Sequence, residues 1–219
     1  MTAKNPVRAQ LLAHLELQDA AGGFSDEAFA RLQELVTEIR AESPVPAPML
    51  ALDRVEGRWE TVFAHFGARH SAGKTRVHDS DLKVQSFNRF PAAPVKVTRI
   101  CQEIARAGCA YNNVIDFLTP NGAARGVMVV RGVFRGDDAN PQRFVVDFVR
   151  VELHPVAGTS ELQLREGLGF TAVEPLLVDL KPPRLHSDVV YLDDDMRINI
   201  GSFGGLYLLR RSPEPPFSI

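Results

Sequence analysis

The chain lacks the features that mark several special classes of protein. It has only two cysteines, Cys101 and Cys109, and their spacing matches no metal or redox motif, so we expect two reduced, partly buried thiols. The formal net charge is only −2, which gives no strong field to attract nucleic acid or an anionic membrane. No apolar run comes near the roughly 20 residues that a membrane-spanning helix needs.

The N-terminus also lacks a targeting signal. Its apolar stretch is interrupted by His14 and Glu16, and no small-residue cleavage site follows, which excludes a signal peptide. The stretch is too acidic and too poor in serine for a transit peptide. We therefore expect a cytoplasmic protein, with peripheral contact to a membrane as the open alternative.

The first part of the chain carries helical periodicity. We expect an N-terminal helical segment with a proline-rich connector over residues 1–48, a barrel domain over 49–212 and an irregular tail over 213–219. The clearer of two helices begins after Ser25, a good N-cap, with acidic residues in its first turn. Its apolar face consists of Phe29, Leu32, Leu35, Val36 and Ile39. The prolines of residues 42–48 end the helical part.

After Pro48 the pattern changes to short apolar runs separated by turn residues. About eight strands with no helical periods between them predict a mainly β protein, an antiparallel barrel or sandwich, and closure into a barrel removes exposed edges. The segment Glu161–Arg165 is the weakest of these strands. The others are Arg58–Phe66, Val95–Ile104, Tyr111–Leu118, Gly126–Phe134, Phe144–Leu153, Met196–Ile200 and Leu206–Arg210.

Specific motifs carry the interpretation further. Val189–Ile198, with its Tyr-Leu-Asp and Arg-Ile, is followed by the glycine turn 201–205 and a last strand. This order resembles the C-terminal signature of the plastid-lipid-associated-protein (fibrillin) family. Upstream, the same resemblance covers the Gly-x-Trp of Val55–Val62, Cys101–Ile104, Asn113–Phe117 and Arg143–Phe148.

The resemblance extends from about residue 50 to residue 211 and leaves the N-terminal helices unmatched. It implies a lipocalin-like (calycin-type) barrel, and it implies binding or organising of hydrophobic molecules such as fatty acids, quinones and carotenoids. It brings no catalytic residues. Because no transit peptide is recognised, the chain resembles a bacterial relative rather than a plastid protein.

Arg197 is the candidate polar group of the site. If Met196, Ile198 and Ile200 face outward or toward the helices, then Arg197 and Asn199 point into the barrel, because alternate residues of a strand face opposite ways. A buried arginine needs a carboxylate, and Asp193 and Asp116 are the candidate partners. Arg197 then serves either as a structural ion pair or as the group that orients a ligand head.

The remaining expectations concern the ligand. The residues expected to line a ligand site are Trp59, Phe63, Tyr111, Asn113, Phe117, Phe148, Tyr191 and Arg197. We expect no catalytic residues, no metal site and no cofactor, because no nucleophile elbow, zinc spacing or phosphate loop is present. The first hypothesis is a carrier of a fatty acid, quinone or isoprenoid. The alternative is a structural protein whose apolar helix face, residues 28–39, docks on a lipid surface or protein partner while the barrel is filled.

Overall fold

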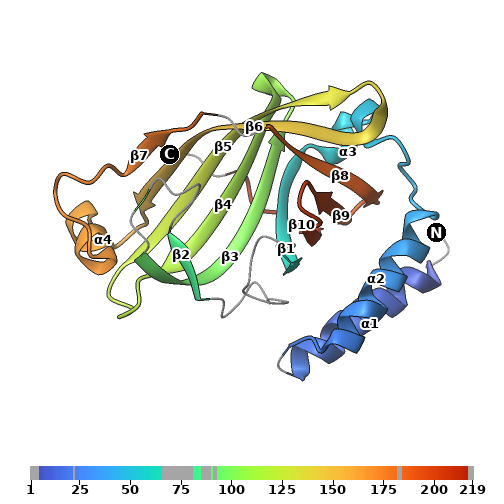
Figure 1. Ribbon diagram of the computed structural model, residues 1–219, viewed down its shortest axis with the longest axis horizontal. Helices are drawn as coiled ribbons and strands as arrows, with labels where there is room; N and C mark the ends of the chain where they lie inside the picture. The colour runs from blue at the N-terminus through green and yellow to red at the C-terminus, as the bar shows by residue number, and fades with distance from the viewer. Residues whose placement is uncertain are drawn as a thin grey trace.

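The computed structural model describes residues 5–21, 23–65, 81–84, 90, 93–181 and 184–216. Its elements confirm a mainly β protein behind two helices (Figure 1). The helices are α1 (Pro6–Ala20), α2 (Asp26–Arg40), the 3-10 turn η1 (Pro48–Leu50), α3 (Leu52–Val55), η3 (Ala107–Cys109) and α4 (Glu161–Leu168). The strands are β1 (Gly57–His65), β2 (Asp81–Val84), β3 (Ala93–Ala105), β4 (Ala110–Leu118), β5 (Arg125–Asp137), β6 (Asn140–Pro155), β7 (Leu177–Asp179), β8 (Arg184–Leu192), β9 (Met196–Gly201) and β10 (Leu206–Arg211).

The sheet closes on itself. Its antiparallel strands follow the order β1-β10-β9-β8-β6-β5-β4-β3, and β1 pairs again with β3, so these eight strands form the expected barrel. At the seam, Trp59 of β1 lies opposite Gln102 of β3 and opposite Arg211 of β10. The short strands β2 and β7 pair with β3 and β6 outside this ring. Phe66, the last residue of the predicted first strand, lies outside the described residues.

The expected strand Glu161–Arg165 is wrong, because this segment is helix α4. Ser160 and Gln163 form a capping box, and the Arg165 guanidinium pairs with Glu161 one turn earlier at 2.8 Å. Leu164 and Leu168, which are both buried, have the spacing of a helix face rather than of a strand. The missing barrel strand is β8, which lay unrecognised before the acidic turn of residues 193–195.

The two larger apolar cores of the described residues lie on either side of the barrel wall. The larger one fills the barrel interior, where Phe134 and Phe144 pack with ring centroids 5.1 Å apart. The second lies between α1, α2 and the outer wall of β1, β8, β9 and β10, beside which the helices run in Figure 1. Ser25 caps α2 as expected, since its hydroxyl accepts a hydrogen bond from the backbone N–H of Ala28 at 3.1 Å. In the described part of the chain, no helix has the length and apolar character of a membrane span.

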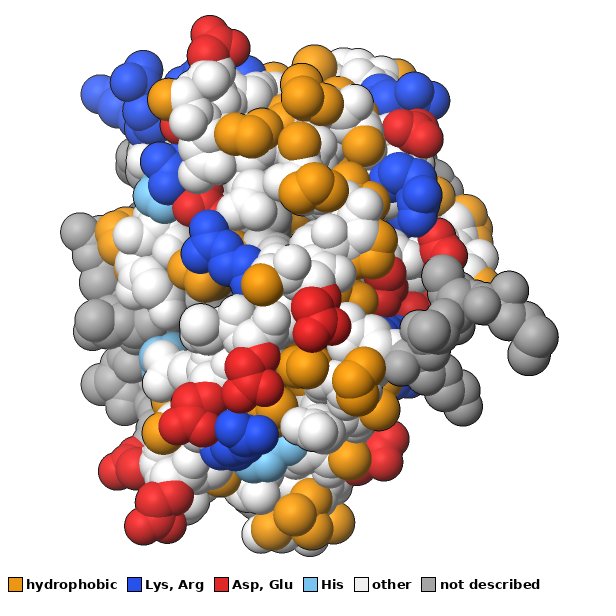
Figure 2. Space-filling model, turned by 90° about the vertical axis from the view of Figure 1, so that its right-hand side faces the viewer, with side chains coloured by type: hydrophobic (Ala, Val, Ile, Leu, Met, Phe, Trp, Pro, Cys, Tyr) orange, Lys and Arg blue, Asp and Glu red, His pale blue; other side chains and the backbone are white. Residues whose placement is uncertain are grey.

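The second core buries the apolar face of α2, which the docking hypothesis assigns to a lipid surface or a protein partner. Leu32, Leu35, Val36 and Ile39 of α2 are all buried in it. Because this face is buried, docking through residues 28–39 would require the helices to leave the barrel. The side of the molecule shown in Figure 2 carries interspersed hydrophobic, basic and acidic side chains.

The acidic turn between β8 and β9 ties α1 to the barrel. Arg8 of α1 pairs with Asp193 at 2.9 Å and also bonds Asp195, and Arg54 of α3 pairs with Asp194. The Asp193 carboxylate accepts further hydrogen bonds from the Tyr191 hydroxyl at 2.8 Å and from the backbone N–H of Met196 at 2.7 Å. The turn is therefore an anchoring point for the helical segment.

We expect Asp193→Asn to destabilise the protein at neutral pH and to make its free energy of unfolding depend less on pH in the acid range. Burial disfavours the charged carboxylate, but hydrogen bonds from Tyr191 and from backbone N–H groups outweigh burial and lower the pKa of Asp193. A lowered folded-state pKa stabilises the protein above the unfolded value, about 3.9, and this stabilisation is lost as pH falls through the folded value. Losing the charge should cost about 1.5–3 kcal/mol at pH 7.

Urea denaturation of wild type and Asp193→Asn between pH 2 and pH 7 measures this effect. The difference in the free energy of unfolding should be largest at pH 7 and should shrink toward the acid end. Asp138→Asn, at an exposed turn carboxylate, is the matched control and should follow the wild type. Equal pH profiles for wild type and Asp193→Asn would contradict the expectation.

Candidate functional site

The structure divides the expected ligand-site residues into two groups. Trp59, Tyr111, Phe117 and Phe148 belong to the interior core of the barrel. Phe63 and Tyr191 instead lie on the outer wall, in the core shared with α1 and α2. Placing these last two residues in the interior was wrong.

A bulge explains each of the two errors. The pairing of β1 with β10 shifts register between Thr61 and Phe63, and the pairing of β8 with β9 shifts between Val189 and Tyr191. An extra residue in one strand turns all later side chains to the other face. Alternation counted from Trp59 therefore fails beyond the bulge, and Phe63 meets Phe24 at a centroid distance of 4.8 Å.

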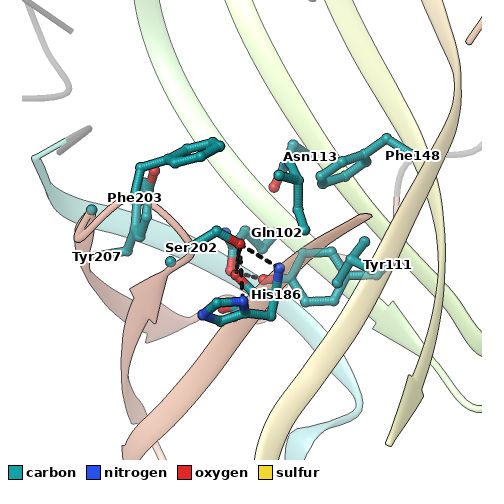
Figure 3. A pocket seen from close by; sticks show the side chains of 13 residues that line it. Gln102, Tyr111, Asn113, Phe148, His186, Ser202, Phe203 and Tyr207 are labelled. Atoms are coloured by element: carbon teal, nitrogen blue, oxygen red, sulfur yellow. Dashed lines mark hydrogen bonds between the residues drawn. The ribbon is translucent and has the colours of Figure 1, made fainter. Parts of the chain in front are cut away.

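A small pocket opens into the barrel where β8 and the β9–β10 hairpin meet β4 and β6 (Figure 3). Its volume is about 120 Å³. Of the expected residues it contains Tyr111, Asn113 and Phe148. The full lining is Gln102, Tyr111, Asn113, Val146, Phe148, Leu185, His186, Ser187, Gly201, Ser202, Phe203, Gly205 and Tyr207.

Several of these lining residues were missed from sequence. Gln102 lies in β3, a strand that the sequence predicts. Ile104, two residues later and therefore on the same face of the strand, is buried in the interior core. Alternation along this strand could therefore have placed Gln102 inside. Ser202 and Phe203 belong to the hairpin between β9 and β10, and their approach to the pocket depends on tertiary packing.

A buried polar cluster lies behind the pocket. The Gln102 side-chain oxygen Oε1 accepts hydrogen bonds from Arg197 Nη2 at 2.6 Å and from the Tyr111 hydroxyl at 3.0 Å. Asn199 Nδ2 lies 3.3 Å from the same oxygen and 3.0 Å from the Ser187 hydroxyl. Arg197 and Asn199 are fully buried, whereas Met196 and Ile198 pack toward the helices, which confirms the predicted alternation.

The ion pair expected for Arg197 is absent. Asp193 pairs with Arg8, and Asp116 pairs with Arg99 at 2.7 Å, because both carboxylates lie on other parts of the barrel wall. No carboxylate of the described residues pairs with Arg197, and its Nε and Nη1 atoms have no hydrogen-bond partner there. Burial lowers the pKa of Arg197 to about 10, so the side chain stays protonated at neutral pH.

Trp59 lies between two guanidinium groups. The Arg197 carbon Cζ stands 4.9 Å from the indole ring centre, and that of Arg211 stands 4.1 Å from it. The indole N–H donates to the backbone oxygen of Val55 at 2.8 Å, as a buried tryptophan requires. These contacts offset part of the cost of burying Arg197.

Helix α4 covers the interior around Phe117. A methyl group built on Gly126 would lie 2.6 Å from the Phe117 ring and 2.8 Å from Leu164 of α4. A larger residue at position 126 would have to displace the Phe117 ring and the end of the Leu164 side chain. Phe117 is therefore packed core and lies outside the pocket lining.

The pocket also brings a serine and a histidine together. The Ser202 hydroxyl lies 3.2 Å from His186 Nδ1, but it also accepts the His186 backbone N–H at 2.6 Å. The neighbouring Asp188 carboxylate binds Arg143 at 2.7 Å instead of orienting the imidazole. The pair thus fixes the hairpin, and no carboxylate of the described residues completes a nucleophilic triad with it.

Other reactive groups in the described residues are dispersed. They include no group of three or more His, Cys, Asp or Glu side chains that could hold a metal ion. Both cysteines are free, with Cys101 buried, while Cys109, expected to be partly buried, is exposed.

Comparison with known proteins gives one family and one curated relative. The PAP_fibrillin family model matches residues 8–210, a range that includes the helices left unmatched by the motifs. The chain is 24% identical over 201 residues to plastid lipid-associated protein 1, chloroplastic, of Brassica campestris. That alignment covers 85% of this chain and 61% of the relative, so the chain spans less than two thirds of the relative's length. No solved structure matches the chain significantly.

Proposed function

The chain belongs to the PAP_fibrillin family, and from that premise we propose that it binds the polar end of a hydrophobic small molecule in the barrel pocket. The family and the barrel fold are consistent with lipid-associated binding. The ligand classes that fit are a fatty acid, a quinone or an isoprenoid with a polar head. The observation that carries the proposal is an open pocket with apolar and aromatic residues in its lining and with Gln102, whose side-chain oxygen accepts a hydrogen bond from the buried Arg197.

The size of the pocket limits what it can bury. Pockets that enclose drug-sized ligands have volumes of about 300–1,000 Å³. A pocket of about 120 Å³ holds a head group and its first few atoms. The rest of the ligand would extend out of the pocket, whose lining includes Phe203, a residue that is 39% exposed.

We propose binding without catalysis. The Ser202 hydroxyl is fixed by backbone groups, and among the described residues His186 has no carboxylate to orient it. The carrier hypothesis is also favoured over docking through α2, because the apolar face of α2 is already buried against the barrel.

Filling the pocket tests the proposal. Leu185 lines the pocket from β8, and Leu185→Trp would place an indole in much of its volume. We expect this change to weaken the binding of a fluorescent fatty acid roughly tenfold or more, since the head group loses its space. Displacement titration with unlabelled fatty acid measures the affinity of both proteins.

Leu177→Trp is the matched control, because Leu177 is 47% exposed on β7, away from the pocket lining. It should bind the fluorescent fatty acid as the wild type does. Failure of fatty acids, quinones and isoprenoid alcohols alike to bind the wild type would refute the proposed function. Equal binding by Leu185→Trp and wild type would place the ligand elsewhere.

A further inference from the structure

The orientation of the Gln102 amide is fixed by its buried neighbours. Arg197 can only donate hydrogen bonds, so the group that faces its Nη2 atom at 2.6 Å must be the amide oxygen Oε1. The Tyr111 hydroxyl and Asn199 Nδ2 also approach this oxygen. Turning the amide over would set its NH₂ group against Arg197, at the cost of a buried hydrogen bond and a donor–donor contact.

The other end of this amide is available to a ligand. Gln102 is 7% exposed and lines the pocket, and Nε2 makes no hydrogen bond with any described residue. Figure 3 shows Gln102 between Ser202 and Tyr111, at the inner side of the pocket. A donor held in one orientation therefore faces the space that a ligand would occupy.

The pocket lining carries no acidic side chain among the residues that the structure describes. Behind it lies the protonated Arg197, without a carboxylate partner among the described residues, and the Arg211 guanidinium lies over the same Trp59 ring. In a poorly solvated interior such an uncompensated charge favours an electron-rich group and disfavours a cation.

From this geometry we infer that Gln102 selects the polar end of the ligand, by donating from Nε2 to an oxygen acceptor such as a carboxylate or a quinone carbonyl. Arg197 is then a positioning residue, which holds the amide and supplies the positive charge. The inference rests on the proposed function and adds the chemistry of the head group. A hydroxyl head is a weaker match, and a cationic head is disfavoured.

Probes with comparable tails and different heads test the inference on the full chain. They are dodecanoate, dodecanol, dodecyltrimethylammonium and a decyl-substituted benzoquinone, each used below its micelle concentration. Trp59 is the only tryptophan, so its emission reports binding beside the cluster, and calorimetry gives an independent affinity. For the wild type we expect dodecanoate and the quinone to bind more tightly than dodecanol, and the ammonium probe to bind roughly tenfold or more weakly than dodecanoate.

Gln102→Glu removes the donor and gives Arg197 a carboxylate partner. We expect dodecanoate to weaken roughly tenfold or more and the ammonium probe to bind more tightly, which reverses the preference for head charge. A purely structural role of Gln102 would change all four affinities alike. Gln33→Glu, an exposed position on α2, is the matched control and should keep the wild-type order.

Each outcome bears on one of the two claims. Equal affinity of the wild type for all heads, or an equal loss for all heads in Gln102→Glu, overturns the inference and leaves the proposed function standing. Failure of every probe to bind the wild type overturns both. Should Gln102→Glu fail to fold in a thermal melt, the wild-type series still decides, because head selectivity is measured there directly.

Discussion

Replacing Arg197 by methionine should leave the ligand-free protein at least as stable as the wild type and should sharply weaken the binding of an anionic head. Arg197 is fully buried without a carboxylate partner among the described residues, and two of its nitrogen atoms lack hydrogen bonds there. Replacing a buried charge by an apolar side chain of similar length is often neutral or stabilising, because the desolvation cost disappears. A residue that lowers stability but supports ligand binding through a neighbour should show these two opposite effects when it is replaced.

In Arg197→Met the loss of binding should be large, because the charge of Arg197 supports the head group through the amide of Gln102. A hydrogen bond that involves a charged group contributes about 1.5–3 kcal/mol, which corresponds to roughly 10- to 150-fold in affinity. In Arg197→Met the Gln102 amide also loses the donor that fixes its orientation. Dodecanoate should therefore bind far more weakly, while dodecanol should change little.

Thermal denaturation and calorimetric titration of Arg197→Met measure the two effects separately. Arg211→Met is the informative comparison, because Arg211 also lies over the Trp59 ring but donates to the backbone oxygens of Glu56 and Asp194. It should lose stability and keep the head-group preference. If Arg197→Met were strongly destabilised and bound dodecanoate normally, the role of Arg197 would be structural.

Local alternation predicted the inner face of β9 correctly. Met196 and Ile198 face the helices, and Arg197 and Asn199 face the interior, because no bulge interrupts this strand between them. The barrel class followed from strand spacing and turn residues, and the motifs between residues 50 and 211 resembled the family whose model the chain matches. These features depend on short stretches of sequence.

Features that depend on distant contacts were not predictable. Asp193 was a reasonable partner for Arg197, but Arg8 of α1, far away in the sequence, binds it instead. The spacing of residues 161–165 suggested a strand because the segment is short, although its Ser-x-x-Gln capping box indicates a helix. Gln102 was missed because its role arises only when β9 is brought opposite β3 inside the closed barrel.

The last prediction concerns Phe63, which the bulge in β1 turns away from the pocket. Truncating this side chain should cause a large loss of stability without weakening ligand binding. Phe63 is 1% exposed and packs on Phe24 and Phe29 between the barrel wall and the helices. Phe63→Ala should destabilise the protein by about 3–5 kcal/mol, because truncating a buried phenylalanine removes its burial and leaves a cavity. Its affinity for dodecanoate, measured well below the melting temperature, should stay that of the wild type.

Phe203→Ala should show the opposite behaviour. Phe203 lines the pocket at its opening, so its truncation should weaken dodecanoate binding while the free energy of unfolding changes by about 1 kcal/mol or less. If Phe63→Ala weakened binding as much as Phe203→Ala does, Phe63 would belong to the ligand site after all. The bulge in β1 would then not separate the ligand site from the barrel wall that packs on α1 and α2, because Phe63 would belong to both.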